Sequence, residues 1–117
     1  MNTIDDIDTS GLLRLLHRDV QLWNEWREGH LEVKVSFRNE SLSHLNLIRG
    51  NFTGVDFSGV NFTESDLSGA NLVGANLKRA DLSDSKLIGA NLVGAKLTGA
   101  DLSHANLISA QIGRAHV

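Results

Sequence analysis

Large apolar residues recur at every fifth position along most of this chain. From Phe37 to Ile112, all sixteen such positions hold Phe, Leu or Ile. The residue two places earlier is Ala, Ser or Gly in eleven of the sixteen cases, and the residue one place earlier is Asn or Asp in eleven. The six letters ANLVGA stand at 70–75 and again at 90–95. The period of five is therefore nested within a period of 20.

A period of five fits neither regular element. On an α-helix five residues turn through about 500°, so successive leucines would spread around the axis instead of forming one stripe. On a straight strand they would alternate between the two faces. Within one pentad, however, the small residue and the Leu lie two apart on the same side of a short extended segment. The two residues that follow must then bend the chain, and Gly is frequent at the second of them.

One bend per pentad, always in the same sense, predicts a closed coil with Leu and Ala inside. If four bends complete a turn, residues 20 apart stack about 4.8 Å from each other, the spacing of paired strands. We therefore expect an all-β solenoid of about four coils, in which each coil buries its core against its neighbours. The large side chains that we expect in the core include Phe37, Leu47, Phe52, Phe57, Phe62, Leu72 and Leu92.

The stretch GANLVGANLKRADLSDSKLIGANLVGAKLTGADLSHANL resembles the A-(D/N)-L-x-x pattern of the pentapeptide-repeat family. This resemblance covers about 80 residues and implies a right-handed, quadrilateral parallel β-helix with four pentads per coil. The first coils depart from the pattern, because Glu40 and Leu45 stand where a small residue belongs. An unpaired carboxylate is costly to bury, so we expect the first turn to be irregular.

Residues 1–30 lack the repeat and form a separate segment, with residues 31–117 as the β-helix. The stretch TSGLLRLLHRDVQLWNEWREGH predicts one helix, with Thr9 or Ser10 as its N-cap and Gly29 as its C-terminal stop. We expect this helix to cover the exposed edge of the first coil and to place its tryptophans near Phe37. Its covering face holds Leu16, Val20, Trp23 and Trp26. The segment VQLWNEWREGH also resembles the W-N-x-W-R segment that precedes the repeats in many bacterial, notably cyanobacterial, members of the family.

Composition narrows the function classes. The net charge of −3 is too small to indicate a nucleic-acid or membrane surface, and the absence of Cys excludes thiolate metal sites and disulfides. The acidic start MNTIDDIDTS does not have the form of a signal peptide, and no apolar run is long enough to span a membrane. A cytoplasmic protein is expected, with no cofactor and no nucleic-acid or membrane partner.

Two sets of polar side chains share columns when the coils are stacked. His44, Glu64, Asp84 and His104 fall at one corner, with Asp81 and Asp101 nearby, which raises the possibility of a divalent-cation site. The two histidines are three coils apart, however, so a solvated corner is the favoured interpretation and no metal site is predicted. The column Asn51, Asn71 and Asn91 is expected to bond to neighbouring backbone and to hold the corners.

Catalytic residues are not predicted, since the chain has no Ser-His-Asp spacing, phosphate-binding glycine loop or H-E-x-x-H motif. The candidate partner surface is instead a set of outward apolar residues, namely Ile48, Val73, Ile88, Val93 and Ile108. The predicted function is a non-enzymatic interaction or scaffold module for an unknown protein. The alternative, which the resemblance supplies, is a DNA-mimicking inhibitor of a nucleic-acid enzyme such as DNA gyrase.

The last six residues, IGRAHV, break the repeat. The same hexapeptide results from translating a common sequencing-adapter stretch, ATC-GGA-AGA-GCA-CAC-GTC. We expect residues 112–117 to be non-native and the natural chain to continue with more pentads. The alternative is a true terminus that keeps Ile112 and Ala115 in register. An open final coil is expected to allow two copies to dimerise end to end.

Overall fold

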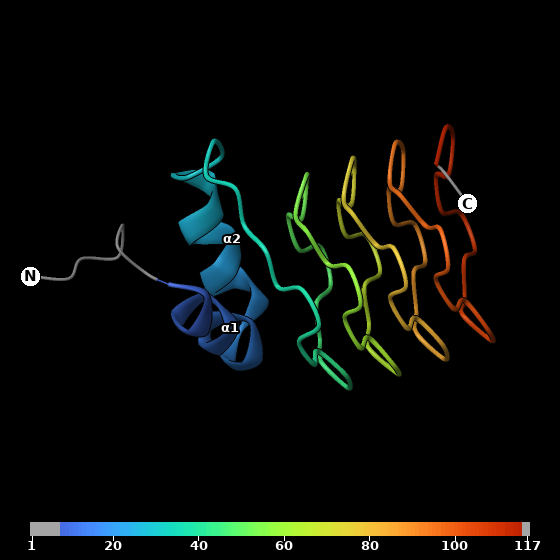
Figure 1. Ribbon diagram of the computed structural model, residues 1–117, viewed down its shortest axis with the longest axis horizontal. Helices are drawn as coiled ribbons and strands as arrows, with labels where there is room; N and C mark the ends of the chain where they lie inside the picture. The colour runs from blue at the N-terminus through green and yellow to red at the C-terminus, as the bar shows by residue number, and fades with distance from the viewer. Residues whose placement is uncertain (1–7, 116–117) are drawn as a thin grey trace, which may run out of the picture.

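The computed structural model describes residues 8–115 and consists of two short helices followed by a stack of coils (Figure 1). Helix α1 spans Thr9–Arg18 and helix α2 spans Val20–Glu28. The coils comprise residues 36–55, 56–75, 76–95 and 96–115, which we call coils 1 to 4. Residues 1–7 of the expected cap segment and 116–117 of the terminal hexapeptide lie outside the described residues.

The expectation of a single helix is wrong, because the chain breaks at Asp19. Its backbone is extended, with φ −170° and ψ 121°, and its side chain accepts a hydrogen bond from the backbone N of Gln21 at 2.9 Å. Asp19 therefore ends α1 and caps α2 at the same time. The N-cap of α1 is Asp8, not Thr9 or Ser10, and its carboxylate accepts from the N of Gly11 at 2.9 Å. Gly29 ends α2 as expected.

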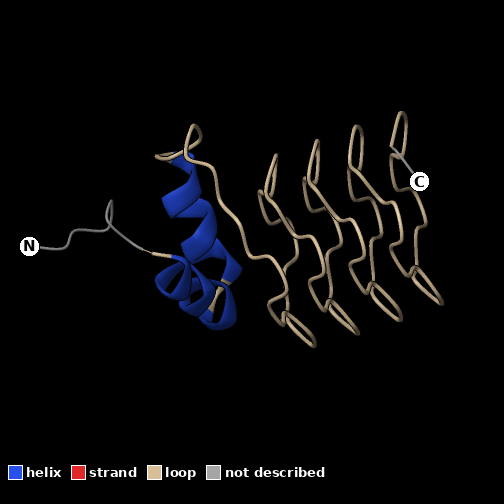
Figure 2. Cartoon of the chain, viewed as in Figure 1, coloured by secondary structure: helices blue, strands red, loops and turns tan. Residues whose placement is uncertain are grey.

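Each coil is held to the next by four parallel bridges between residues 20 apart, from Ser36 with Asp56 to Asn91 with Gln111. The hydrogen bonds come in pairs: the N of Leu72 donates to the O of Asn91 at 2.8 Å, and the N of Asn91 donates to the O of Ala70 at 2.9 Å. Each bridge is a single residue wide, so no continuous strand is drawn in the described chain (Figure 2). The all-β expectation therefore holds in a coarser form, as four stacked, four-sided coils.

The bends follow the pentad. A two-residue turn follows each large apolar residue, as at Leu72, whose O accepts from the N of Ala75 at 3.0 Å. The second turn residue has positive φ, for example 66° at Gly74 and 73° at Gly94, which glycine adopts without strain. A Cβ on Gly94 would also lie 3.7 Å from the N of Gly74 in the coil below. That distance is an ordinary van der Waals contact, so the positive φ, and not the stacking, favours glycine at this corner.

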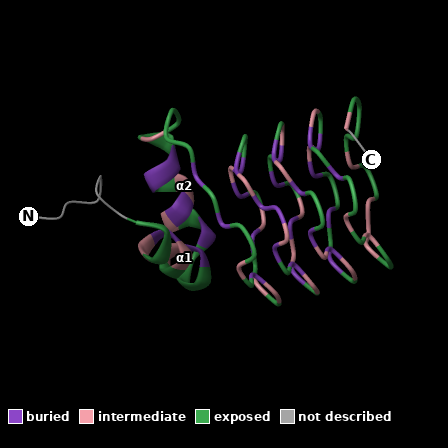
Figure 3. Cartoon of the chain, viewed as in Figure 1, coloured by how far each residue is buried: buried purple, intermediate pink, exposed green. Residues whose placement is uncertain are grey.

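The core runs along the axis of the stack (Figure 3). The structure leaves no accessible surface on most of the large side chains at the fifth positions; Phe37, Leu47, Phe52, Phe57, Phe62 and Leu72 are 0% exposed and Leu92 is 1% exposed. The small residues two places earlier, such as Ala70 and Ala90, are buried beside them. Because the interior is filled by Leu, Phe, Val and Ala, it is a packed core and not a channel.

Coil 1 is regular, contrary to the irregular first turn that Glu40 and Leu45 led us to expect. Ser41 and Asn46 form their bridges to coil 2, and the O of Glu40 accepts from the N of Asn61 at 3.0 Å. Glu40 and Leu45 are only half-buried at this end of the stack. The register of the backbone therefore tolerates both side chains.

Helix α2 covers the end of coil 1. Leu16, Val20, Trp23 and Trp26 are all at most 6% exposed. The ring of Trp23 lies 5.5 Å from that of Phe37 in an edge-on contact and 5.8 Å from that of Phe52 in a stacked one. Such aromatic contacts add to the burial of apolar area.

Side chains of α2 also replace the hydrogen bonds that a preceding coil would make. The indole Nε1 of Trp23 donates to the O of Asn51 at 2.8 Å. The carboxamide of Asn24 accepts from the N of Asn51 at 2.8 Å and donates to the O of Arg49 at 3.1 Å. Asn24 thus pairs with coil 1 as a bridged backbone residue does in the coils beyond.

Arg27 completes this cover. It is 4% exposed, and its guanidinium donates to the O of Thr53 at 3.3 Å, of Val33 at 2.7 Å and of His30 at 3.0 Å. Burial lowers the pKa of Arg27, and the charge of Glu32 opposes that shift. The sequence interpretation assigned the tryptophans to the cap but missed these roles of Asn24 and Arg27.

Candidate functional site

The outer surface of the solenoid divides into four faces, which we name by their side chains. In chain order they are the basic face (36–39, 56–59, 76–79, 96–99), the acidic face (41–44, 61–64, 81–84, 101–104), the isoleucine face (46–49, 66–69, 86–89, 106–109) and the asparagine face (51–54, 71–74, 91–94, 111–114). Each face is adjacent to the next around the coil, and the asparagine face is adjacent to the basic face. In residues 8–115 buried side chains fill the interior of the coils, so these faces form the outer surface of the stack.

The five residues of the candidate partner surface lie on two adjacent faces. Ile88 is 38% exposed and Ile108 66% exposed on the isoleucine face, where Ile48 is half-buried. Val93 is 37% exposed on the asparagine face, beside the half-buried Val73. Ser68 interrupts the isoleucine column in coil 2. Together these residues form two short apolar columns on adjacent faces, with the Asn column between them, and we call this region the apolar corner.

The asparagine face carries no charged side chain in coils 1 to 3. As expected, its Asn side chains hold the turns, because the Oδ1 of Asn71 and of Asn91 each accepts from the backbone N two residues later at 3.1 Å. Asp and Asn make the same contact on the other faces, for example Asp66 with Ser68 at 3.0 Å. The preference for Asn or Asp before each Leu therefore has a structural cause, and it does not by itself mark a binding stripe.

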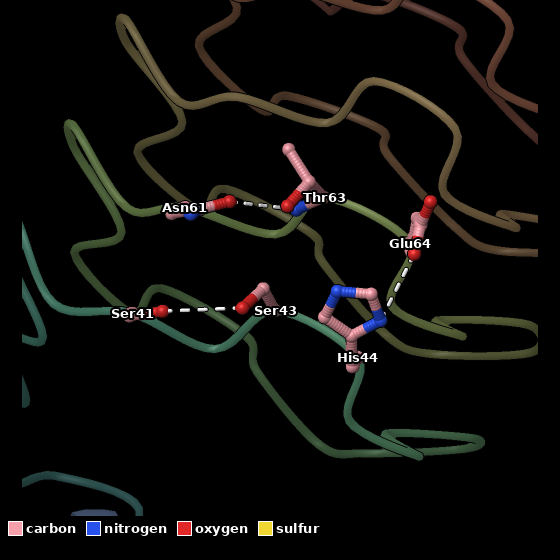
Figure 4. A network of polar contacts seen from close by, with 6 residues as sticks. All are labelled: Ser41, Ser43, His44, Asn61, Thr63 and Glu64. Atoms are coloured by element: carbon pink, nitrogen blue, oxygen red, sulfur yellow. Dashed lines mark hydrogen bonds and ion pairs between the residues drawn. The ribbon is translucent and has the colours of Figure 1, made fainter.

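The acidic face has a different character (Figure 4). The Nδ1 of His44 lies 2.9 Å from the Oε2 of Glu64 in the next coil, with both side chains largely exposed. Asp101 accepts from both the hydroxyl and the backbone N of Ser103, at 2.5 and 2.9 Å, and these bonds lower the pKa of Asp101, the hydroxyl most. Asp81 makes the same pair of contacts with Ser83.

The predicted corner column is present but does not gather into a metal site. In residues 8–115, no group of three or more His, Asp or Glu side chains is close enough to hold a cation. The column has one unusual property: His44, Glu64, Asp84 and His104 all have φ near 60°, a region that favours glycine. The matching corner of the asparagine face is glycine in coils 1 to 3, at Gly54, Gly74 and Gly94, and Arg114 in coil 4.

The basic face carries Arg38, Lys78, Arg79 and Lys96, all exposed, and one carboxylate, Asp56. Across residues 8–115 none of these four cations forms an ion pair, since the pair recorded there is His44 with Glu64. The pKa of Asp56 is lowered overall. Burial alone would raise this pKa, but hydrogen bonds from Ser58 and Ser36 and the charge of Arg38 together outweigh the effect of burial. The sequence interpretation missed this face, because its cations alternate with other residues in the linear text.

A pocket lies where α1 meets α2, lined by residues 16–20 of the helices and by Leu45 and Asn46 of coil 1. Leu45, which stands in place of the usual small residue, is half-buried there and packs against the core. In the described chain, no helix is both long and apolar enough to cross a membrane.

Comparison with known proteins places these faces in context. The family model for pentapeptide repeats matches residues 41–79 and 75–111. The chain is similar to alr5209, a pentapeptide repeat protein from Nostoc PCC 7120, with 37% identity, a TM-score of 0.66 and coverage of 71% of this chain and 69% of that one.

Two further solved structures are more distant. A pentapeptide repeat protein from the Arabidopsis thaliana thylakoid lumen has 26% identity and a TM-score of 0.49, with coverage of 74% and 67%. HetL, a pentapeptide repeat protein from Nostoc sp. strain PCC 7120 involved in heterocyst differentiation regulation, has 27% identity and a TM-score of 0.36, with coverage of 71% and 53%. No curated protein matches the chain.

Proposed function

This chain belongs to the pentapeptide repeat family, and from that premise we propose that it is a non-enzymatic protein-interaction module. The observation that carries the proposal is the apolar corner formed by the isoleucine and asparagine faces, next to two charged faces. We infer the coil to be right-handed and square in section, as the family resemblance implies, so that each face is flat.

The packed interior supports an interaction role over catalysis. Large side chains fill the axis with at most 1% exposure in the central coils, so a substrate has no cavity to enter. The polar residues outside are occupied in turns, as Asn71 and Asn91 are. Recognition on this protein then depends on a flat external surface.

The apolar corner fits a folded protein partner with a matching apolar centre. Val73 and Val93 follow the uncharged Asn column on their face, Ile88 precedes it on the neighbouring face, and the cations Arg49 and Lys86 lie on the same face as Ile88. An apolar centre with a polar rim is the usual arrangement of a protein–protein contact. The patch consists of five side chains, of which Ile48 and Val73 are half-buried, and this favours a transient partner over a permanent one. We place this interaction in the cytoplasm, as the sequence led us to expect.

The test is a double substitution on the apolar corner. Val73→Lys with Ile88→Lys places two charges in the middle of the proposed contact, so capture of protein partners from the native host should be lost while the thermal melt stays nearly unchanged. The matched control, Asn39→Lys with Thr98→Lys, adds the same charge to the basic face at exposed positions. Equal capture by the double variant and the parent would contradict the proposal.

The alternative, a DNA-mimicking inhibitor of an enzyme such as gyrase, rests on the acidic face alone. Glu64, Asp81, Asp84 and Asp101 lie along that face, but four cations occupy the face beside it. A mimic of a DNA backbone needs a continuous negative surface. Inhibition of gyrase supercoiling by the parent, and its loss on changing Asp81 and Asp101 to Lys, would favour this alternative.

A further inference from the structure

The two charged faces of the solenoid are adjacent and have opposite sign. The basic face has four exposed cations and one carboxylate, whereas the acidic face has four carboxylates, at positions 64, 81, 84 and 101, with two histidines. Apart from His44 with Glu64, these charges form no ion pairs in residues 8–115. Each face therefore presents a charge that a partner surface of opposite sign could neutralise.

The charges also match level by level along the axis. Coil 3 carries Lys78 and Arg79 on its basic face and Asp81 and Asp84 on its acidic face. Coil 4 carries Lys96 and Asp101, one on each face. Two copies lying side by side, parallel and in register, would therefore bring opposite charges together at the same height.

Coils 1 and 2 do not share this match. In coil 1 Arg38 is exposed on the basic face, but the acidic face carries His44 and no carboxylate. In coil 2 the carboxylates of Asp56 and Glu64 would meet, but His44 already pairs with Glu64 at 2.9 Å. Asp56 in turn has Arg38 as a nearby positive charge. Two of the four levels therefore pair opposite charges, and the one level with like charges is partly neutralised within each copy, so coils 3 and 4 determine the register.

We propose that four copies of this chain associate side by side as a closed ring, with the basic face of each against the acidic face of the next. On a square rod these two faces meet at a right angle, so each added copy is rotated by a quarter turn and the fourth contact returns to the first copy. A head-to-tail contact that closes in this way gives a finite cyclic oligomer. The ring rests on the square section inferred above.

The shape of the molecule permits this packing. The extents across the long axis are 25 and 22 Å, so the section is nearly equal in both directions. The helices lie over the end of the stack and not along its sides (Figure 1). Parallel rods can therefore approach along their whole coiled length.

Such a ring would turn the isoleucine and asparagine faces outward in every copy. The apolar corner proposed as the partner surface would then appear four times around the assembly, and weak contacts with a multivalent partner would reinforce one another. Self-association uses the charged faces and partner capture uses the apolar corner, so the two proposals can fail separately.

Salt dependence is the first test. The contact consists of exposed charges, whose interaction is screened over about 10 Å at 0.1 M salt and over about 3 Å at 1 M. Sedimentation velocity of the 117-residue chain should show a tetramer at low salt, in about 20 mM NaCl, and a monomer in about 500 mM NaCl. A monomer at low salt across a dilution series would overturn the proposal, and so would an open-ended polymer. An oligomer that persists at high salt would indicate end-to-end contact through the last coil instead.

Charge reversal provides the second test. One variant, K78E/R79E/K96E, makes the basic face negative; the other, E64K/D81N/D84K/D101N, makes the acidic face positive and keeps the turn acceptors as Asn. Each alone has two faces of like charge and should be monomeric at low salt. An equimolar mixture restores opposite charges at every contact, so it should form a tetramer of alternating copies. Failure of the mixture to associate would overturn the ring.

The matched control is R49E/K86E/R114E, which reverses three exposed cations on the other two faces. It has the same net charge as the basic-face variant and should remain tetrameric at low salt; dissociation of this control would show that net charge alone governs assembly. Far-UV circular dichroism establishes that each variant is folded. Arg79→Glu and Asp84→Lys provide a milder pair, at corners with φ of 60° and 58° that already hold either charge. Each of these two variants alone should weaken the tetramer at low salt, and their equimolar mixture should restore it.

Discussion

The first and last coils of this solenoid have the same repeat but very different burial. Phe37, Leu42 and Phe52 of coil 1 are 0% exposed. At the equivalent positions of coil 4, Leu97 is 5% exposed, Leu102 is half-buried and Ile112 is 41% exposed. The gradient is visible along the stack in Figure 3. Coil 1 lies between α2 and coil 2, whereas coil 4 contacts only coil 3 in the described residues. The difference shows that a pentad buries its Leu only when both of its neighbours are present.

The backbone hydrogen bonds of coil 1 also differ from those of a coil that has another coil below it, such as coil 3. The N of Asn91 finds the O of Ala70 in the coil below, at 2.9 Å. The N of Asn51 has no coil below it and finds the carboxamide of Asn24 at 2.8 Å. Helix α2 therefore supplies both the apolar cover and the polar partners that a preceding coil would provide. This is how the chain avoids an open edge at that end.

The largest expected effect breaks a coil that has both neighbours. Leu72→Asp places a charge in the closed core and should cost about 3–5 kcal/mol, a large part of the stability of a small domain. Ile112→Asp, at the equivalent position of coil 4, should change stability by about 1 kcal/mol or less, because that side chain already contacts water. Far-UV circular dichroism and thermal melts measure both. A near-normal melt for Leu72→Asp would mean that the inward assignment is wrong.

A smaller effect is expected at the cap. Asn24→Ala leaves the N of Asn51 and the O of Arg49 without their partner, which should cost about 1–3 kcal/mol in urea unfolding. Gln21→Ala, on the same helix but exposed, is the matched control. Hydrogen exchange should quicken at the N of Asn51 and stay slow at the N of Asn71, which bonds to Gly50. Equal exchange at both amides would show that Asn24 does not replace a coil.

The coil itself was predictable from the sequence because its rule is local. A large apolar residue every five positions and a small one two places before it determine which side chains point inward, and Asn or Asp between them forms the turn contact. The return of ANLVGA after 20 residues gave the number of pentads per coil. These patterns do not depend on contacts with the rest of the fold, so the structure of the coils agrees with what they predict.

The cap was less predictable because its interactions are non-local. Leu12, Leu16 and Val20 keep helical spacing across the break, so periodicity did not reveal Asp19 as a cap. The partners of Asn24 are 25 and 27 residues away, on a surface that exists only after coil 1 has formed. The basic face was missed for the same reason, since Lys78 and Lys96 become neighbours only through stacking, although stacking in register did predict the acidic column. The irregular first turn was expected from the cost of burying Glu40. That cost does not arise, because Glu40 is only half-buried.

The smallest expected effect compares two serines in the same inward column, one coil apart. Ser85 lies in coil 3 and its hydroxyl donates to the O of Leu82 at 2.6 Å, whereas the hydroxyl of Ser65 in coil 2 is buried with no partner in the described residues. Ser85→Ala should cost about 0.5–1 kcal/mol, at the lower end for a hydrogen bond, because the O of Leu82 also accepts from the N of Ser85 at 3.2 Å. Ser65→Ala removes a buried hydroxyl that gains nothing, so it should be neutral or slightly stabilising. Paired urea unfolding curves measure the difference. Equal destabilisation by the two changes would mean that Ser65 also bonds to its own turn, as Ser85 does, and that the coils on either side of the centre are equivalent in this column.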